Sequence, residues 1–116
     1  MTDAGRVLIV EDDALIGMLL IDMFEALDLP KPAQASSLRE ATAFIEHETF
    51  SGALIDVNLA GEKGWPIAEM MASRGIPFAF TTGGGSEVPD EFKHVPIIMK
   101  PFRLNDIEAA IQNFKK

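Results

Sequence analysis

Short apolar runs recur along the chain, and most of them end on a polar or charged residue. Residues 6–10 read RVLIV and are followed by three carboxylates, Glu11 to Asp13. A continuous apolar run, unlike an alternating one, is typical of a strand that is covered on both faces, as in a parallel sheet. The second run is weak by composition and is assigned from its place in the chain. The predicted strands are residues 6–10, 33–36, 53–57, 77–81 and 95–99.

Apolar residues three and four positions apart predict four helices between and after these runs. The first helix is expected to turn Ile16, Leu20, Met23 and Leu27 toward the core, with Asp13 as its N-cap. The predicted helices are residues 14–27, 38–48, 65–73 and 104–114.

The remaining segments complete an alternation of strands and helices. Ser37 and Glu40 have the form of a capping box for the second helix. Residues 59–64 are expected to be a loop, and the polar residues 87–94 leave room only for a short or distorted helix. Strand followed by helix, about five times, predicts a doubly wound α/β fold with a parallel sheet and helices on both faces. Ligands of such sheets bind at the carboxyl ends of the strands.

Length, charge and composition narrow the class of protein. A chain of 116 residues is the size of one domain, so we expect residues 1–116 to form a single unit. It has no cysteine, which excludes disulfides and thiolate metal sites. The net charge of −8 opposes nucleic-acid binding. No apolar run approaches the roughly 20 residues of a membrane span, and no signal peptide is visible, so we expect a cytoplasmic protein.

Five polar residues lie at the ends of the predicted strands or just after them and should converge on one edge of the sheet. They are Glu11, Asp12, Asp56, Thr82 and Lys100, and we call them the rim. Three carboxylates and one lysine leave a charge of −2, which a divalent cation would cancel. Because the ligands are hard oxygens with no thiol, Mg²⁺ fits better than zinc or copper. An acidic rim with Mg²⁺ and a lysine suits phosphoryl transfer to a carboxylate.

These motifs together resemble a known family. The stretches VLIVEDD, LIDVNLAGEKG and MKPF, with a strand ending on Thr82, are similar to the receiver domain of two-component response regulators over essentially the whole length. The resemblance implies a flavodoxin/CheY-like five-stranded sheet of order 2-1-3-4-5. The stretch Phe80-Thr81-Thr82-Gly83 further resembles the receiver subgroup named for its Phe-Ala-Thr-Gly motif (FATGUY), in which the fourth helix is reduced.

The resemblance also implies a role for each matching residue. Asp56 matches the phosphoacceptor, Asp12 the direct Mg²⁺ ligand, and Glu11 an acidic neighbour that acts largely through water. The backbone carbonyl of Asn58 matches a further metal ligand.

The residues that would report on the phosphoryl group match the family less well. Thr82 matches the switch hydroxyl, Lys100 matches the lysine that pairs with the phosphoryl oxygen, and the Lys100–Pro101 bond is expected to be cis. Ile97 stands where the family often has an aromatic switch residue. Further departures from the family pattern are Ala60, Thr81, Gly84 and Gly85.

The expected function is that of a stand-alone receiver domain in a phosphorelay. A histidine kinase or histidine phosphotransfer protein would donate a phosphoryl group to Asp56, which would then switch binding of a downstream protein or act as a phosphate sink. The chain would assist its own phosphorylation and slow dephosphorylation without being an enzyme for other substrates. Two alternatives are a pseudo-receiver that binds partners without phosphoryl chemistry and a small metal-dependent phosphatase, which the lack of substrate-pocket elements disfavours.

The surplus apolar residues of the first helix leave two interpretations open. Leu15, Met18 and Leu19 either belong to the core or form a surface on which partner helices dock. An exposed patch would favour docking. Phe102 is a further candidate for this partner surface.

Overall fold

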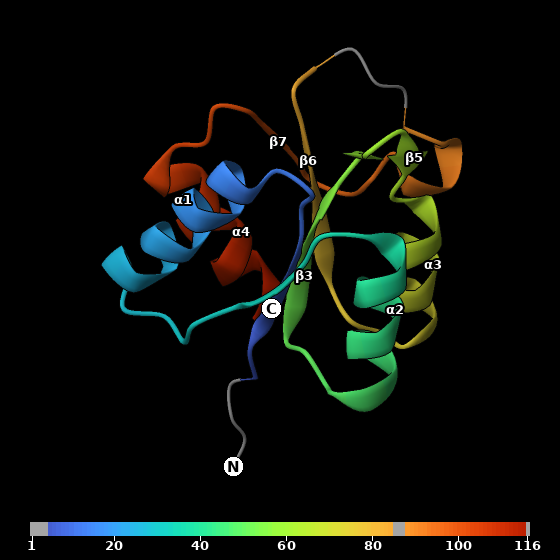
Figure 1. Cartoon of the computed structure of the whole chain (residues 1–116), viewed down its shortest axis with the longest axis horizontal. Coiled ribbons are helices and arrows are strands. Elements are labelled where there is room, and N and C mark those ends of the chain that lie inside the picture. The colour runs from blue at the N-terminus through green and yellow to red at the C-terminus, as the bar shows by residue number, and fades with distance from the viewer. Residues whose placement is uncertain (1–4, 85–87, 116) are drawn as a thin grey trace.

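Five parallel strands form the centre of the molecule. The computed structural model describes residues 5–84 and 88–115. The strands are ordered β2-β1-β3-β6-β7 across the sheet, and every neighbouring pair is parallel (Figure 1). Counted in chain order this is 2-1-3-4-5, so the predicted sheet is confirmed. The strands are β1 (Val7–Val10), β2 (Ala33–Ala35), β3 (Gly52–Asp56), β6 (Phe78–Thr82) and β7 (Ile97–Met99).

Four α-helices cover the sheet from both sides. Helices α1 and α4 lie on one face, and α2 and α3 lie on the other (Figure 1). Within the described residues, none of these helices has the length and apolar character of a membrane span. The helices are α1 (Ala14–Ala26), α2 (Leu38–His47), α3 (Trp65–Ser73) and α4 (Leu104–Phe114).

The sheet divides the hydrophobic core into two layers. Successive side chains of a strand point to opposite faces. In β1, Leu8 and Val10 therefore pack under α2 and α3, while Val7 and Ile9 pack under α1 and α4. All four are buried, which explains why this strand is apolar at every position rather than at every second one.

Helix α1 confirms its predicted cap but not the whole of its predicted stripe. Asp13 Oδ1 accepts hydrogen bonds from the backbone N–H groups of Leu15 and Ile16 at 2.9 and 3.3 Å. Leu20 is buried as expected, but Gly17 and Phe24 complete the buried face. The other predicted stripe residues, Ile16, Met23 and Leu27, are only partly buried.

Gly17 lies on the buried face of α1, against the side chain of Gln34. A Cβ at this position would lie 2.0 Å from Nε2 of Gln34 in β2, so a side chain at position 17 would have to displace the Gln34 side chain. Because nearly every position of α1 is apolar, its sequence pattern gave little indication of which face turns inward.

Helix α2 begins with Ser37 as predicted, but Glu40 binds a different residue. Ser37 Oγ accepts a hydrogen bond from the Glu40 N–H at 3.1 Å. The Glu40 carboxylate accepts from the backbone N–H and hydroxyl of Ser36 at 2.8 and 2.9 Å, one residue before the N-cap. The reciprocal contact of a capping box is therefore shifted by one position.

Two connections between the main elements contain short elements of their own. The predicted loop 59–64 contains a small antiparallel hairpin, β4 (Asn58–Leu59) with β5 (Glu62–Lys63). Between β6 and β7, the described residues hold only one 3₁₀ turn, η1 (Asp90–Phe92), which confirms that no regular helix fits there. Gly85, Ser86 and Glu87 of the predicted loop and turn lie outside the described residues.

Candidate functional site

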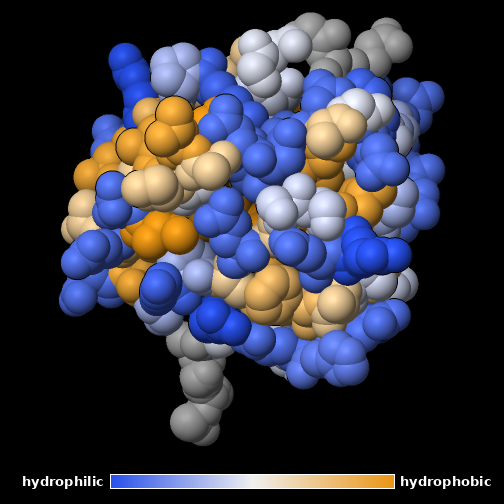
Figure 2. All heavy atoms as spheres, viewed as in Figure 1, coloured by the Kyte–Doolittle hydropathy of each residue, from blue (hydrophilic) through white to orange (hydrophobic). Residues whose placement is uncertain are grey.

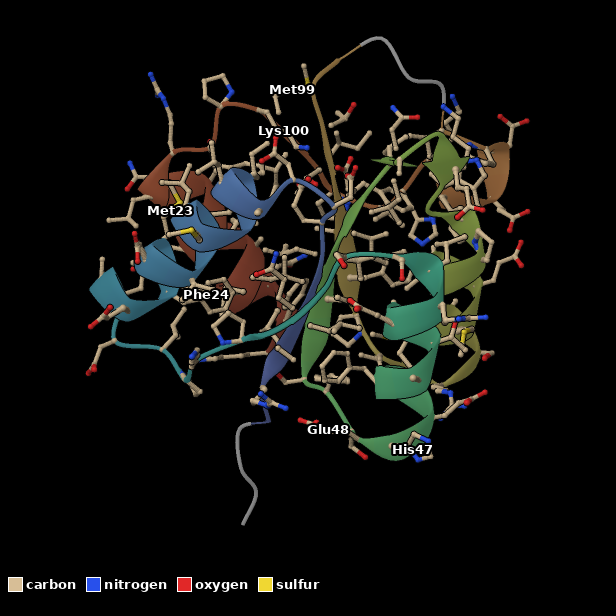
Figure 3. All side chains as sticks on the ribbon, in the orientation of Figure 1. Met23, Phe24, His47, Glu48, Met99 and Lys100 are labelled. Atoms are coloured by element: carbon tan, nitrogen blue, oxygen red, sulfur yellow. The ribbon has the colours of Figure 1, made fainter. Side chains whose placement is uncertain are left out.

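The parallel topology brings the rim residues together. Asp56 and Thr82 are the last residues of β3 and β6, Glu11 and Asp12 follow β1, and Lys100 follows β7. Lys100 Nζ lies 3.0 Å from Asp56 Oδ2 and 3.0 Å from Glu11 Oε1. Figure 3 shows Lys100 at one end of the sheet and His47 at the opposite end. The structure therefore confirms that these residues converge on one edge of the sheet.

Burial makes the charges of this cluster interact strongly. The exposed fractions of Glu11 and Asp56 are 1% and 4%. Burial raises the pKa of Glu11, and the neighbouring Asp56 charge adds to this, although the Asp13 N–H and Lys100 act in the other direction. Burial alone would lower the pKa of Lys100, but hydrogen bonds and charges from Asp56 and Glu11 outweigh it, and the pKa is raised. Lys100 is therefore firmly held as a cation.

The carboxylates of this cluster fit a hard divalent cation. Oxygens of Glu11, Asp12 and Asp56 all lie within 4.8 Å of one another. Glu11 Oε1 is buried and is not aligned for a hydrogen bond, although Lys100 Nζ lies 3.0 Å away. Mg²⁺ takes oxygen ligands and usually keeps several waters, so a group of three carboxylates suits it. The set of three carboxylates therefore fits such an ion.

The backbone after β3 holds the Asp56 side chain in place. Asp56 Oδ1 accepts a hydrogen bond from the Asn58 N–H at 3.1 Å, and Oδ2 accepts one from Lys100. A Cβ at Gly64 would lie 2.5 Å from the Asp56 carbonyl oxygen, so only glycine permits this close approach. Sequence reasoning missed Gly64, for which the only signal was its place at the end of the GEKG stretch.

The hairpin also adds a contact that the sequence did not reveal. Lys63 Nζ donates a hydrogen bond to Asn58 Oδ1 at 2.7 Å across the β4–β5 pair. No local pattern pairs these two residues, since the contact depends on the turn at Ala60 and Gly61, both with positive φ.

Thr82 lies close to the site but is turned toward its own loop. It is buried, and its Oγ1 accepts a hydrogen bond from the Gly84 N–H at 3.0 Å. A Cβ at Gly84 would lie 3.5 Å from Cε of Met99, so the Met99 side chain lies beside this loop. The Lys100 N–H donates to the Thr82 carbonyl at 2.8 Å. The Thr82 hydroxyl, the loop at Gly84 and the end of β7 at Met99 are thus in contact.

The other predicted site residues divide into confirmed and wrong assignments. The Lys100–Pro101 bond is cis, as predicted. Leu15, Met18 and Leu19 are 77%, 60% and 42% exposed and contribute to the apolar surface over α1 in Figure 2. Phe102 is wrong as a surface residue, because it is 7% exposed and packs into the core layer beneath α1 and α4.

Comparison with known proteins gives the class. The model of the response regulator receiver domain matches residues 7–112, and the chain belongs to this family. A comparison with curated protein sequences gives no match.

Solved structures include close relatives. The chain is 38% identical to SdrG from Sphingomonas melonis Fr1, with all of both chains covered and a TM-score of 0.85. The BeF3-activated conformation of SdrG from Pseudomonas melonis Fr1 gives 38% identity, 97% coverage of each chain and a TM-score of 0.81. The response regulator PhyR from Brucella abortus gives 30% identity and a TM-score of 0.77, with 94% of this chain but 46% of the PhyR chain covered.

Proposed function

We propose that this receiver domain accepts a phosphoryl group on Asp56 from a phosphohistidine of a histidine kinase or phosphotransfer protein. The observation that carries the proposal is the buried Asp56 carboxylate, 3.0 Å from Lys100 Nζ and grouped with Glu11 and Asp12 at the strand ends. Each further carboxylate placed close to the others costs several kcal/mol of electrostatic repulsion. A cluster of three carboxylates is therefore unfavourable for stability alone and supports a role in chemistry.

The transfer step follows from the contacts of Asp56. A carboxylate oxygen of Asp56 attacks the phosphorus, the P–N bond to the donor imidazole breaks, and its electron pair stays on the imidazole nitrogen, which then takes a proton. The Asn58 N–H and the Lys100 ammonium orient the carboxylate before attack. Mg²⁺, held by Glu11, Asp12, Asp56 and the Asn58 carbonyl, would supply neutralisation of the phosphoryl oxygens. Water later attacks the phosphorus, the P–O bond to Asp56 breaks, and inorganic phosphate and the free carboxylate are released, so the domain acts on itself rather than on other substrates.

The switch would follow from the new charge. A phosphoryl group adds roughly two negative charges and three strong acceptors next to Thr82 and Lys100. In the structure, the Thr82 hydroxyl accepts a hydrogen bond from the Gly84 N–H. After phosphorylation, it would give up this bond and donate to a phosphoryl oxygen. Because Met99 lies beside Gly84, this change reaches β7 and alters binding of a downstream protein.

Two finer assignments belong to the same proposal. We place the chain in the FATGUY subgroup, supported by Phe80-Thr81-Thr82-Gly83 at the end of β6 and by the 3₁₀ turn where other receivers have a fourth helix. The partners are proteins rather than nucleic acid or membrane, supported by the net charge of −8, and the setting is the cytoplasm. The chain is 25% identical to the anti-anti-sigma factor PhyR from Bartonella quintana, and this similarity supports an anti-sigma factor as the downstream partner.

Replacing the acceptor tests the proposal directly. Asp56→Asn removes the attacking carboxylate while keeping the size of the side chain, so labelling by a small phosphodonor with Mg²⁺ is expected to disappear in intact-mass spectra. The matched control is Asp13→Asn, because Asp13 caps α1 and should leave labelling unchanged. Undiminished labelling of the Asp56 variant would reject the acceptor assignment. Absence of labelling in the unmodified chain, with Mg²⁺ binding intact, would favour the pseudo-receiver alternative.

A further inference from the structure

Strand β7 forms an open edge of the sheet. It is the last strand in the order β2-β1-β3-β6-β7, and its one neighbour among the described residues is β6. The Phe80 N–H donates to the Pro96 carbonyl at 2.9 Å, and the Lys100 N–H donates to the Thr82 carbonyl at 2.8 Å. Backbone polar groups alternate in direction along a strand. Those of Ile97 and Met99 therefore point away from β6, to the outside of the sheet.

The side chains beside this edge are apolar and uncovered. Ile97 and Met99 are 46% and 54% exposed, whereas Ile98 between them is buried on the α4 side. Figure 1 shows α2 and α3 to the right of the central strands, with the orange η1 turn on the same side, in the connection that leads from β6 to β7. Because η1 (Asp90–Phe92) is only three residues long, it does not cover the face of β7 as a helix would.

A groove runs along the same edge. It has a volume of about 630 Å³ and lies between β7 and the outer side of α4, with Ile97, Met99, Asp106, Ala109 and Asn113 in its walls. This volume is within the range of ligand sites in proteins, about 300–1,000 Å³. Its walls combine apolar surface with one carboxylate and amide groups.

We propose that β7 is a docking edge for an extended, basic segment of a partner protein, which adds to the sheet as a further strand. Only an extended backbone satisfies the outward N–H and C=O groups of Ile97 and Met99 in register. Apolar side chains on one face of that segment would contact Ile97 and Met99, and basic side chains on its other face would lie in the groove beside α4.

Charge selects this occupant over a second copy of the chain. Two copies with a net charge of −8 each repel one another, whereas a segment rich in Lys or Arg is attracted and can pair with Asp106 in the groove. Pro96 and Pro101 border the strand and limit the edge to about three residues, which disfavours sheet-to-sheet aggregation.

The test uses the whole chain, labelled with ¹⁵N, and a peptide of about nine residues in which Lys and Val alternate. We expect saturable shift changes centred on β7 and hydrogen exchange of the Ile97 and Met99 amides slowed by about tenfold or more. Two control peptides have the same length, one with the same sequence N-methylated at alternate residues and one with Glu in place of Lys, and neither should slow this exchange.

Two matched variants locate the binding surface. Ile97→Lys places a cation on the edge, which opposes strand addition, and should weaken binding of the basic peptide at least tenfold. Leu15→Lys makes the same change on the exposed apolar surface of α1 and should leave binding unchanged. The proposal is overturned if the shifts centre on the rim, if the N-methylated peptide binds equally well, or if sedimentation shows that the free chain pairs with itself through β7.

Discussion

The rim and the β7 side of the molecule lie next to each other, yet different forces stabilise them. The rim is a buried ionic cluster in which Lys100 bridges Asp56 and Glu11. The β7 side of the molecule, by which we mean β7 and the connection that leads to it from β6, depends on apolar contacts. Phe92 of η1 packs among the rings of Trp65, Phe78 and Phe80. The rim residues are fixed by strand ends that every parallel sheet of this order brings together. The β7 surface depends on the connection of residues 83–96, in which η1 is the one helical turn among the described residues.

The largest expected effect concerns the aromatic cluster on the β7 side. Ring centroids of Phe92 lie 5.7, 5.9 and 6.3 Å from those of Phe80, Phe78 and Trp65. Phe92→Ala leaves a cavity in this cluster and should lower the free energy of unfolding by about 3 kcal/mol, as for other Phe→Ala changes in cores. Urea unfolding followed by circular dichroism measures this loss.

The same variant tests whether the two regions are separable. Mg²⁺ affinity of Phe92→Ala should equal that of the unmodified chain, since no rim residue contacts Phe92 in the ring cluster. Phe44→Ala is a suitable control, because Phe44 is only partly buried and makes one ring contact, 6.1 Å from Phe50. Loss of Mg²⁺ binding in Phe92→Ala alone would show that the rim depends on the η1 turn.

The next effect concerns the lysine of the rim. Lys100→Met removes the one ammonium that bridges Glu11 and Asp56 and leaves two buried carboxylates facing each other. Removing one partner of a fully buried ion pair costs about 3–5 kcal/mol. Since the Lys100 side chain is 18% exposed, we expect about 2 kcal/mol without Mg²⁺, measured by urea unfolding, and partial recovery when Mg²⁺ is added.

A double-mutant cycle separates charge from packing in this prediction. In an Asp56→Asn background, Lys100→Met should cost clearly less, because one of the two facing charges is already gone. Equal costs in both backgrounds would mean that Lys100 stabilises the chain through Glu11 or through packing of its alkyl stem, and not through the charge of Asp56.

Sequence reasoning was most successful where a local motif coincides with a strand end. Glu11, Asp12, Asp56 and Lys100 were predictable because each follows or ends an apolar run. A parallel sheet places the carboxyl ends of these strands at one edge, which brings the four side chains together. The order of strands and the absence of a regular helix between β6 and β7 in the described residues also followed from pattern and resemblance.

What could not be predicted depends on contacts between distant segments. The buried face of α1 includes Gly17, which lies against Gln34 seventeen positions away, and the nearly uniform apolar pattern of the helix did not indicate that face. Phe102 looked like a surface residue beside the MKPF motif, but it is buried beneath the helices. The Lys63–Asn58 bond required a hairpin that no residue pattern indicated.

A smaller effect tests the link between the rim and β7. Thr82→Ala removes the acceptor of the Gly84 N–H and should cost about 1 kcal/mol, the usual value of one hydrogen bond. The more informative readout is the NMR response of Gly84 and Met99 to beryllofluoride with Mg²⁺. This response should persist in Thr82→Ser, which keeps the hydroxyl, and should fall by more than half in Thr82→Ala. A full response in Thr82→Ala would place the link elsewhere.

The smallest effect is expected from an exposed ion pair at the other end of the sheet, which serves as the counterpart to Lys100. Arg6 donates two hydrogen bonds to the Glu48 carboxylate, at 2.7 and 2.8 Å, and the hydrogen bonds from Arg6 lower the pKa of Glu48 below its ordinary value of 4.5. A lowered carboxyl pKa contributes stability that is present above the ordinary value and is lost as pH falls through the folded-state value. Since both side chains are about a third or more exposed, Glu48→Gln should cost less than about 1 kcal/mol at neutral pH. The difference from the unmodified chain should stay constant above pH 5 to 6, shrink below 4.5 and vanish in strong acid, as followed by urea unfolding across pH. A difference that persisted in acid would show that Glu48 stabilises the chain without its charge, and the contrast between a buried and an exposed ion pair would then lose its basis.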